Sequence, residues 1–124
     1  MEKIEMLYTK VAAALNAIVL VENKRKGKRA AENVIAELNR KHLKFYEEHP
    51  DEERLPESYA DEWLDAYSVA KKAGIAYRRS LKDFLKTYDE YPYNVLADLY
   101  TCEDAEGRYL AIREQVTRNF IITF

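Results

Sequence analysis

Four acidic side chains in the middle of the chain have a spacing that could bind a metal ion. They are Glu57, Asp61, Glu62 and Asp65. Three of them recur every four residues, so a helix places them along one face. Helical carboxylates of this kind can hold Mg²⁺ and position a phosphate, provided that a second helix offers further acids, such as Glu32 and Glu37. A Mg²⁺-dependent all-α phosphohydrolase is therefore one hypothesis, and a solvated acidic start to a helix is the simpler interpretation.

Two clusters of basic residues could contact phosphates. One consists of Lys24, Arg25, Lys26, Lys28 and Arg29, and the other of Arg78, Arg79, Lys82 and Lys86. Basic faces beside aromatic side chains, such as Tyr77, suit single-stranded nucleic acid, so the alternative function is a nucleic-acid-binding helical protein. A pI near 5.8 and the acidic blocks that flank both clusters favour a competing interpretation, in which the charges neutralise one another inside the fold.

The chain is rich in tyrosine, with ten in 124 residues. Several lie among acids in a segment, residues 87–107, that contains no Lys or Arg. Tyrosine supplies contact area with a polar tip and is enriched at interfaces. The segment therefore predicts a surface that binds another protein with a basic surface. Its candidate residues are Tyr88, Asp89, Glu90, Tyr91, Tyr93, Asp98 and Tyr100. The competing interpretation assigns Tyr59, Tyr67, Tyr77 and Tyr88 to a core.

No common catalytic signature occurs in the sequence, which has no P-loop, GxGxxG, GxSxG or HExxH motif. We therefore predict no catalytic residue, no metal ligand set and no cofactor. His42 lies on an apolar stripe, which favours a satisfied or boundary histidine over a ligand. Cys102 is the only cysteine, which excludes an intrachain disulfide and favours a reducing, cytoplasmic setting.

Hydrophobic periodicity predicts mainly helical structure. The expected elements are a helix over residues 2–23, a turn at Gly27, a helix over 28–48 and a proline-bracketed loop over 49–56. A long central helix over 57–90 follows, because aromatic and small residues keep helical spacing through Gly74. A turn at Gly74 that splits this helix is the alternative.

The last thirty residues allow two interpretations. Asn94 can cap a short helix over residues 95–101, and a second helix can begin near Glu103. A β-hairpin that turns at Glu106 and Gly107 competes with this interpretation. The apolar, β-branched residues 120–124 suggest a short strand or a docked tail.

Length and composition set the class of protein. A chain of 124 residues with 48% hydrophobic residues fits a single globular domain over residues 1–124. Three glycines and three prolines disfavour a turn-rich β fold. The longest apolar stretch, residues 11–21, is too short to cross a membrane. We expect a mainly α-helical bundle around one long helix, soluble and cytoplasmic.

The expected function is a non-catalytic protein-binding module: an inhibitor, an adaptor or a small assembly subunit, of the type that phages and mobile elements often encode. Self-association as a homodimer is also expected. Ala70, Ala73 and Gly74 form a narrow waist on the long helix, where a second helix could cross closely.

Overall fold

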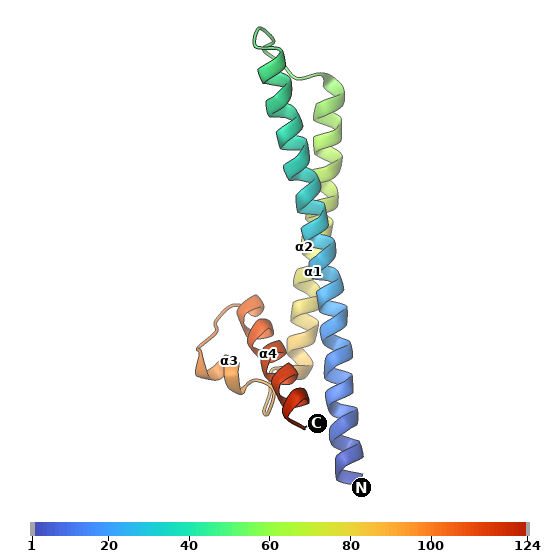
Figure 1. Cartoon of the computed structure of the whole chain (residues 1–124), viewed down its shortest axis with the longest axis vertical. Coiled ribbons are helices and arrows are strands. Elements are labelled where there is room, and N and C mark those ends of the chain that lie inside the picture. The colour runs from blue at the N-terminus through green and yellow to red at the C-terminus, as the bar shows by residue number, and fades with distance from the viewer. Residues whose placement is uncertain (1, 124) are drawn as a thin grey trace. The chain divides into compact units, whose positions relative to one another are not determined.

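The computed structural model describes residues 2–123, with side chains described over residues 12–118. It contains four helices, which Figure 1 shows: α1 (Glu2–Glu48), α2 (Glu57–Tyr88), α3 (Val95–Leu99) and α4 (Ala105–Thr123). No strand occurs in this part of the chain. The prediction of a mainly helical protein is confirmed.

The first helix is longer than the sequence indicated. α1 runs for 47 residues through Gly27, so the predicted turn there is wrong. A glycine costs a helix interior only about 1 kcal/mol relative to alanine, which does not force a break. The surrounding Lys and Arg residues are good helix formers, and Lys28 forms an i,i+4 ion pair with Glu32 at 3.6 Å. α1 ends at Glu48, two residues before Pro50, because a proline disfavours helical geometry in the residue before it.

The second helix has the continuity that its aromatic spacing predicted. α2 spans 32 residues and passes through Gly74, which is buried. Tyr77, Leu81 and Phe84, which share this helical spacing, are buried core residues. Tyr67 is exposed instead and stacks on Trp63 with ring centroids 5.2 Å apart. The continuous-helix interpretation is confirmed, and the alternative turn at Gly74 is wrong.

The C-terminal part is helical as well. Asp104 precedes α4 and accepts a hydrogen bond from the backbone N–H of Gly107 at 2.5 Å, which satisfies an N-terminal donor of the helix. The hairpin alternative is therefore wrong. α4 continues to Thr123, so the predicted short strand is also wrong over residues 120–123. Whether the tail docks on the body is a prediction that lies outside the described side chains.

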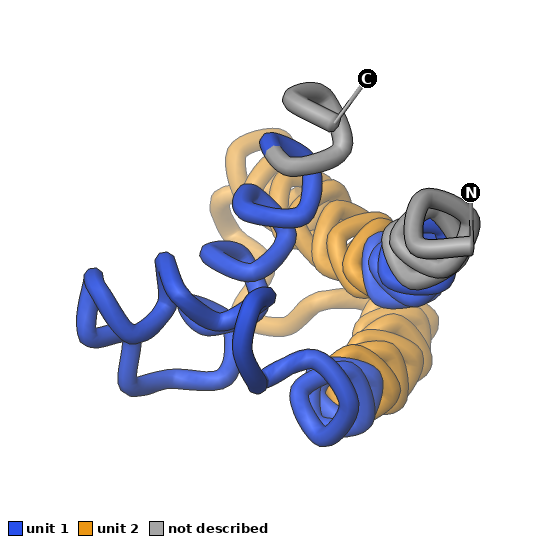
Figure 2. Tube along the Cα trace, turned by 90° about the horizontal axis from the view of Figure 1, so that it is seen from below, with its two compact units in different colours: residues 1–23, 78–124 blue, residues 24–77 orange. Residues whose placement is uncertain are grey.

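The chain divides into two compact units, which Figure 2 distinguishes by colour. Unit 1 comprises residues 1–23 and 78–124, and unit 2 comprises residues 24–77. Unit 1 holds most of the buried apolar side chains, namely Ala14, Ile18, Val21, Leu81, Phe84, Ala97, Tyr109, Ala111, Ile112 and Val116. Unit 2 is a helical hairpin whose loop end is packed by aromatic rings. A single domain over residues 1–124 stays a prediction.

Candidate protein-interaction surface

Residues 87–107, the segment with several tyrosines and acids but no Lys or Arg, lie in unit 1. α2 ends near the start of this segment, at Tyr88. The chain reverses in a turn in which the Glu90 carbonyl accepts hydrogen bonds from the backbone N–H groups of Tyr93 (2.8 Å) and Asn94 (3.1 Å). The Tyr91–Pro92 peptide bond within this turn is cis. Asn94 occupies the N-cap position of α3, as predicted, but its side chain forms no capping hydrogen bond. Tyr91, within this turn, is exposed.

Arg108 in the first turn of α4 fixes this segment in place. Its guanidinium donates to both carboxylate oxygens of Asp89, with Nε 2.9 Å from Oδ2, and also to Asp98 Oδ1 at 3.0 Å. It reaches the Cys102 carbonyl oxygen at 3.2 Å as well. These hydrogen bonds to two carboxylates raise the pKa of Arg108 above its usual range. Arg108 thus binds two of the acids in a segment that itself contains no base and balances one of their two negative charges.

Gln115 provides a second attachment, between α3 and α4. Its side-chain oxygen accepts a hydrogen bond from the backbone N–H of Leu96 at 2.8 Å, and its amide nitrogen donates to the Pro92 carbonyl oxygen. One side chain therefore satisfies an N-terminal donor of α3 and an acceptor in the preceding turn. Together with Arg108 it holds residues 89–102 against α4.

Tyr109 anchors α4 to the rest of unit 1. Its ring is fully buried and lies edge-on to Phe84, with centroids 5.1 Å apart. Its hydroxyl donates to Glu22 Oε1 at 2.8 Å, and the same oxygen accepts from Arg113 at 2.6 Å. The buried hydroxyl is therefore satisfied by a carboxylate whose charge is balanced.

Two of the predicted contact tyrosines pack within the protein. Tyr88 stacks on Phe84 at 4.9 Å and meets the Tyr93 ring edge-on at 5.4 Å. Burial, followed by the neighbouring Tyr88 and Glu90, raises the pKa of Tyr93 above its usual value of 10.0. Both rings are half-buried, and their contact links the end of α2 to the turn.

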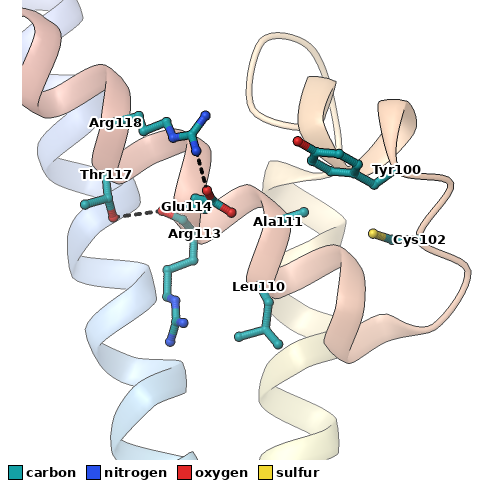
Figure 3. Close-up of a pocket in the computed structure, with 8 residues that line it drawn as sticks. All are labelled: Tyr100, Cys102, Leu110, Ala111, Arg113, Glu114, Thr117 and Arg118. Carbon is teal, nitrogen blue, oxygen red and sulfur yellow. Dashed lines mark hydrogen bonds and ion pairs between the residues drawn. The ribbon is translucent and has the colours of Figure 1, made fainter.

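Three large side chains of the segment remain at the surface. Tyr91, Leu99 and Tyr100 are 83%, 69% and 66% exposed. Tyr100 and Cys102 also form one wall of an open pocket of ≈ 640 Å³, and α4 forms the other wall, as Figure 3 shows. Arg118 on the α4 wall is paired with Glu114 at 2.6 Å. The pocket therefore lies beside the segment, and side chains of both charges line it.

The structure sorts the candidate residues into three groups. Arg108 brings Asp89 and Asp98 together, and Tyr88 and Tyr93 support the turn. The remaining candidates, Glu90, Tyr91 and Tyr100, are exposed. Sequence reasoning missed Arg108 and Leu99. The only sequence signal for Arg108 was its position as the first base after the base-free segment.

The two basic clusters fall in different units. Lys24, Arg25, Lys26, Lys28 and Arg29 belong to unit 2, and Arg78, Arg79, Lys82 and Lys86 belong to unit 1. In the first cluster, Lys28 is engaged by Glu32 and also lies 5.3 Å from the centroid of the Tyr77 ring. The members of the second cluster are all exposed, and they form no ion pair within the part of the chain that the structure describes.

The four acids that could have bound Mg²⁺ do not form a metal site in the described part of the chain. Glu57, Asp61, Glu62 and Asp65 are all exposed, and Glu62 pairs with Lys41 at 3.1 Å. Glu32 pairs with Lys28 on its own helix. Among the described residues, no three or more His, Cys, Asp or Glu side chains are grouped so that they could hold a metal ion.

Comparison with known proteins adds no relative. No family model, curated protein or solved structure matches the chain. Within the described residues, no helix combines the length and the apolar character needed to cross a membrane.

Proposed function

We propose that this protein is a non-catalytic protein-binding module: an inhibitor, adaptor or small assembly subunit with a helical-bundle fold. Its contact surface is the tyrosine surface, defined here as Glu90, Tyr91, Leu99 and Tyr100. The observation that carries the proposal is the exposure of three large apolar or aromatic side chains on one short segment of unit 1. Aromatic anchors of this kind contribute most of the binding free energy at many interfaces.

The support beneath the tyrosine surface favours binding. Arg108 and Gln115 fix the backbone of residues 89–102 in the free protein. A contact segment that is already ordered loses less conformational entropy on association, so more of the contact energy appears as affinity.

The charge around the tyrosine surface favours a partner with a basic surface. Glu90, Glu103 and Asp104 are exposed, and Asp98 keeps 61% of its side chain exposed despite its ion pair with Arg108. Acids at the rim of an interface mainly raise the rate of association and select partners of opposite charge. The single cysteine accords with a cytoplasmic location, which we include in the proposal.

Affinity capture from the native host, followed by mass spectrometry, tests the proposal. The full chain is compared with the double variant Tyr91→Ala/Tyr100→Ala and with the control Tyr46→Ala, which removes an exposed tyrosine of unit 2. We expect one or more partners to be captured by the unchanged chain and by the control but not by the double variant. Equal recovery with all three would exclude the tyrosine surface as the contact.

A nucleic-acid-binding function is the second candidate. Arg78, Arg79, Lys82 and Lys86 fall within about 100° of arc on α2 at 3.6 residues per turn, opposite the buried face that contains Tyr77 and Leu81. Four uncommitted cations on one face can neutralise phosphates and release counterions. Anisotropy with a labelled single-stranded DNA should then show binding that weakens steeply with salt and is lost in Arg78→Ala/Arg79→Ala. No binding at low salt would exclude it.

A further inference from the structure

Unit 2 carries an apolar groove along one face of its helical hairpin. The groove has a volume of ≈ 470 Å³, and its apolar lining is Ala31, Val34 and Leu38 of α1 with Ala66 and Val69 of α2. Val34 and Val69 are 48% and 59% exposed. Burial of apolar surface contributes about 25 cal/mol per Å², so a partner that covered both valines would gain free energy from the contact.

The register of the hairpin places these two valines level with each other. Lys41 of α1 pairs with Glu62 of α2 at 3.1 Å, and the Lys28 ammonium lies 5.3 Å from the centroid of the Tyr77 ring. Val34 lies about midway between the two lysines along α1. Val69 lies about midway between Glu62 and Tyr77 along α2. The centre of the groove is therefore a pair of exposed valines, one from each helix.

Two charges of opposite sign flank Val69 along α2. Asp65 lies four residues before Val69 and also lines the groove, and Lys72 lies three residues after it. Seven residues are about two helical turns, so both side chains lie along the same edge of the helix. Both are exposed, and neither forms an ion pair within the described part of the chain.

We infer that this groove is the contact between two copies of the chain. The copies are related by a two-fold axis that passes beside Val34 and Val69, perpendicular to the helices. Such an axis sets α2 antiparallel to α2 of the second copy. Asp65 of each copy then faces Lys72 of the other, so the same ion pair forms twice while the valines are buried between the copies. The charge pattern around Val69 is thus complementary to itself.

The size of the face is sufficient for a stable dimer. Residues 24–48 of α1 form a segment about 37 Å long, and two helices side by side are about 20 Å wide. A face of roughly 700 Å² per copy is close to what one partner buries in a standard interface. The inference concerns unit 2 alone and does not depend on the tyrosine surface in unit 1. The sequence placed the expected self-association at the waist around Gly74, but Gly74 is already buried within one copy. We therefore assign the contact to the groove around Val69 instead.

Sedimentation equilibrium of the full chain tests the inference. We expect the mass to rise with concentration from 14.6 kDa towards twice that value. Val34→Glu and Val69→Glu should each raise the dimer dissociation constant at least about tenfold, because they place a charge at the centre of the contact. Leu43→Glu and Leu64→Glu are matched controls: they change exposed leucines of the same helices that do not line the groove, and they should leave the constant unchanged.

A charge exchange on the exposed edge tests the geometry without disturbing any packed residue. Asp65→Lys should weaken the dimer at low salt, because two lysines then face each other across the contact. The double variant Asp65→Lys/Lys72→Asp should restore it. A chain that stays monomeric at every accessible concentration overturns the inference. A double variant whose dimer dissociation constant is no lower than that of Asp65→Lys also overturns it. A monomeric chain whose groove instead binds a cationic amphipathic peptide would assign the groove to another protein.

Discussion

The guanidinium of Arg108 donates hydrogen bonds to both carboxylate oxygens of Asp89, a residue nineteen positions earlier in the chain. The pair closes the loop between α2 and α4 and orders the segment that carries the tyrosine surface. Because Asp98 is bound by the same guanidinium, one cation fixes both the start of the turn and the short helix α3.

Loss of this guanidinium should destabilise the protein. Arg108→Met keeps much of the side-chain volume but leaves Asp89 partly buried without its cation, so we expect unfolding to become easier by about 1–2 kcal/mol. Arg118→Met is the matched control, since Arg118 forms an exposed i,i+4 pair with Glu114 that contributes under about 0.5 kcal/mol. Urea unfolding followed by circular dichroism measures both. Equal losses in the free energy of unfolding for the two variants would show that Arg108 stabilises the protein no more than an exposed surface ion pair does.

Tyr93 should limit stability at alkaline pH. Its pKa in the folded state is raised above 10.0, mainly by burial, so the folded state holds the phenol proton more tightly than the unfolded state. The resulting stabilisation is complete below pH 10 and is lost as the pH rises through the folded-state pKa. Tyr93→Phe should therefore move the alkaline unfolding midpoint to higher pH, as followed by circular dichroism. Tyr91→Phe, at an exposed position, is the control and should leave the midpoint in place. A midpoint unchanged by Tyr93→Phe would mean that another group limits alkaline stability.

His42 should be replaceable with a gain in stability. Its ring stacks on Tyr59 with centroids 5.5 Å apart, but its Nε2 atom is buried and has no hydrogen-bond partner among the described residues. We expected a satisfied or boundary histidine: the half-buried side chain fits a boundary position, but Nε2 is not satisfied within the described part of the chain. An unpaired buried polar atom costs about 1–3 kcal/mol, so His42→Phe, which keeps the stacked ring, should stabilise the hairpin by about 1 kcal/mol. Thermal unfolding checks this. A lower melting temperature for His42→Phe than for the unchanged chain would refute it.

Two glycine substitutions should have opposite effects. A Cβ at Gly27 would meet nothing within 4 Å, so Gly27→Ala should stabilise α1 by about 1 kcal/mol through helix propensity alone. A Cβ at Gly107 would lie 2.6 Å from Asp104 Oδ1, the oxygen that caps α4, so Gly107→Ala should destabilise the protein. Chemical denaturation of the two variants side by side gives the comparison. Effects of the same sign would contradict it.

Local patterns predicted the helices well wherever a long periodic signal existed. The aromatic and small residues of α2 kept their phase through Gly74, and the helix is continuous there. The prediction failed at Gly27 because a glycine beside basic residues resembles a helix C-terminus. The energetic cost of a single glycine is too small to end a helix whose neighbouring lysines, arginines and alanines favour it.

The parts of the site that depend on tertiary geometry could not be predicted. Whether Asp89 and Asp98 meet a cation depends on how the turn after Tyr88 folds back, and no spacing rule connects them to Arg108. The exposure of Val34 and Val69 could not be predicted from the sequence for a similar reason. A helical stripe identifies an apolar face but does not show how much of that face a single partner helix covers.

Hydrogen exchange on the captured complex tests the central proposal most directly. We expect the partner to slow exchange of backbone amides within residues 89–101 and to leave residues 49–56, a largely exposed loop of unit 2, unchanged. Protection confined to residues outside 89–101, such as those around Arg78 and Arg79, would contradict a contact through the tyrosine surface.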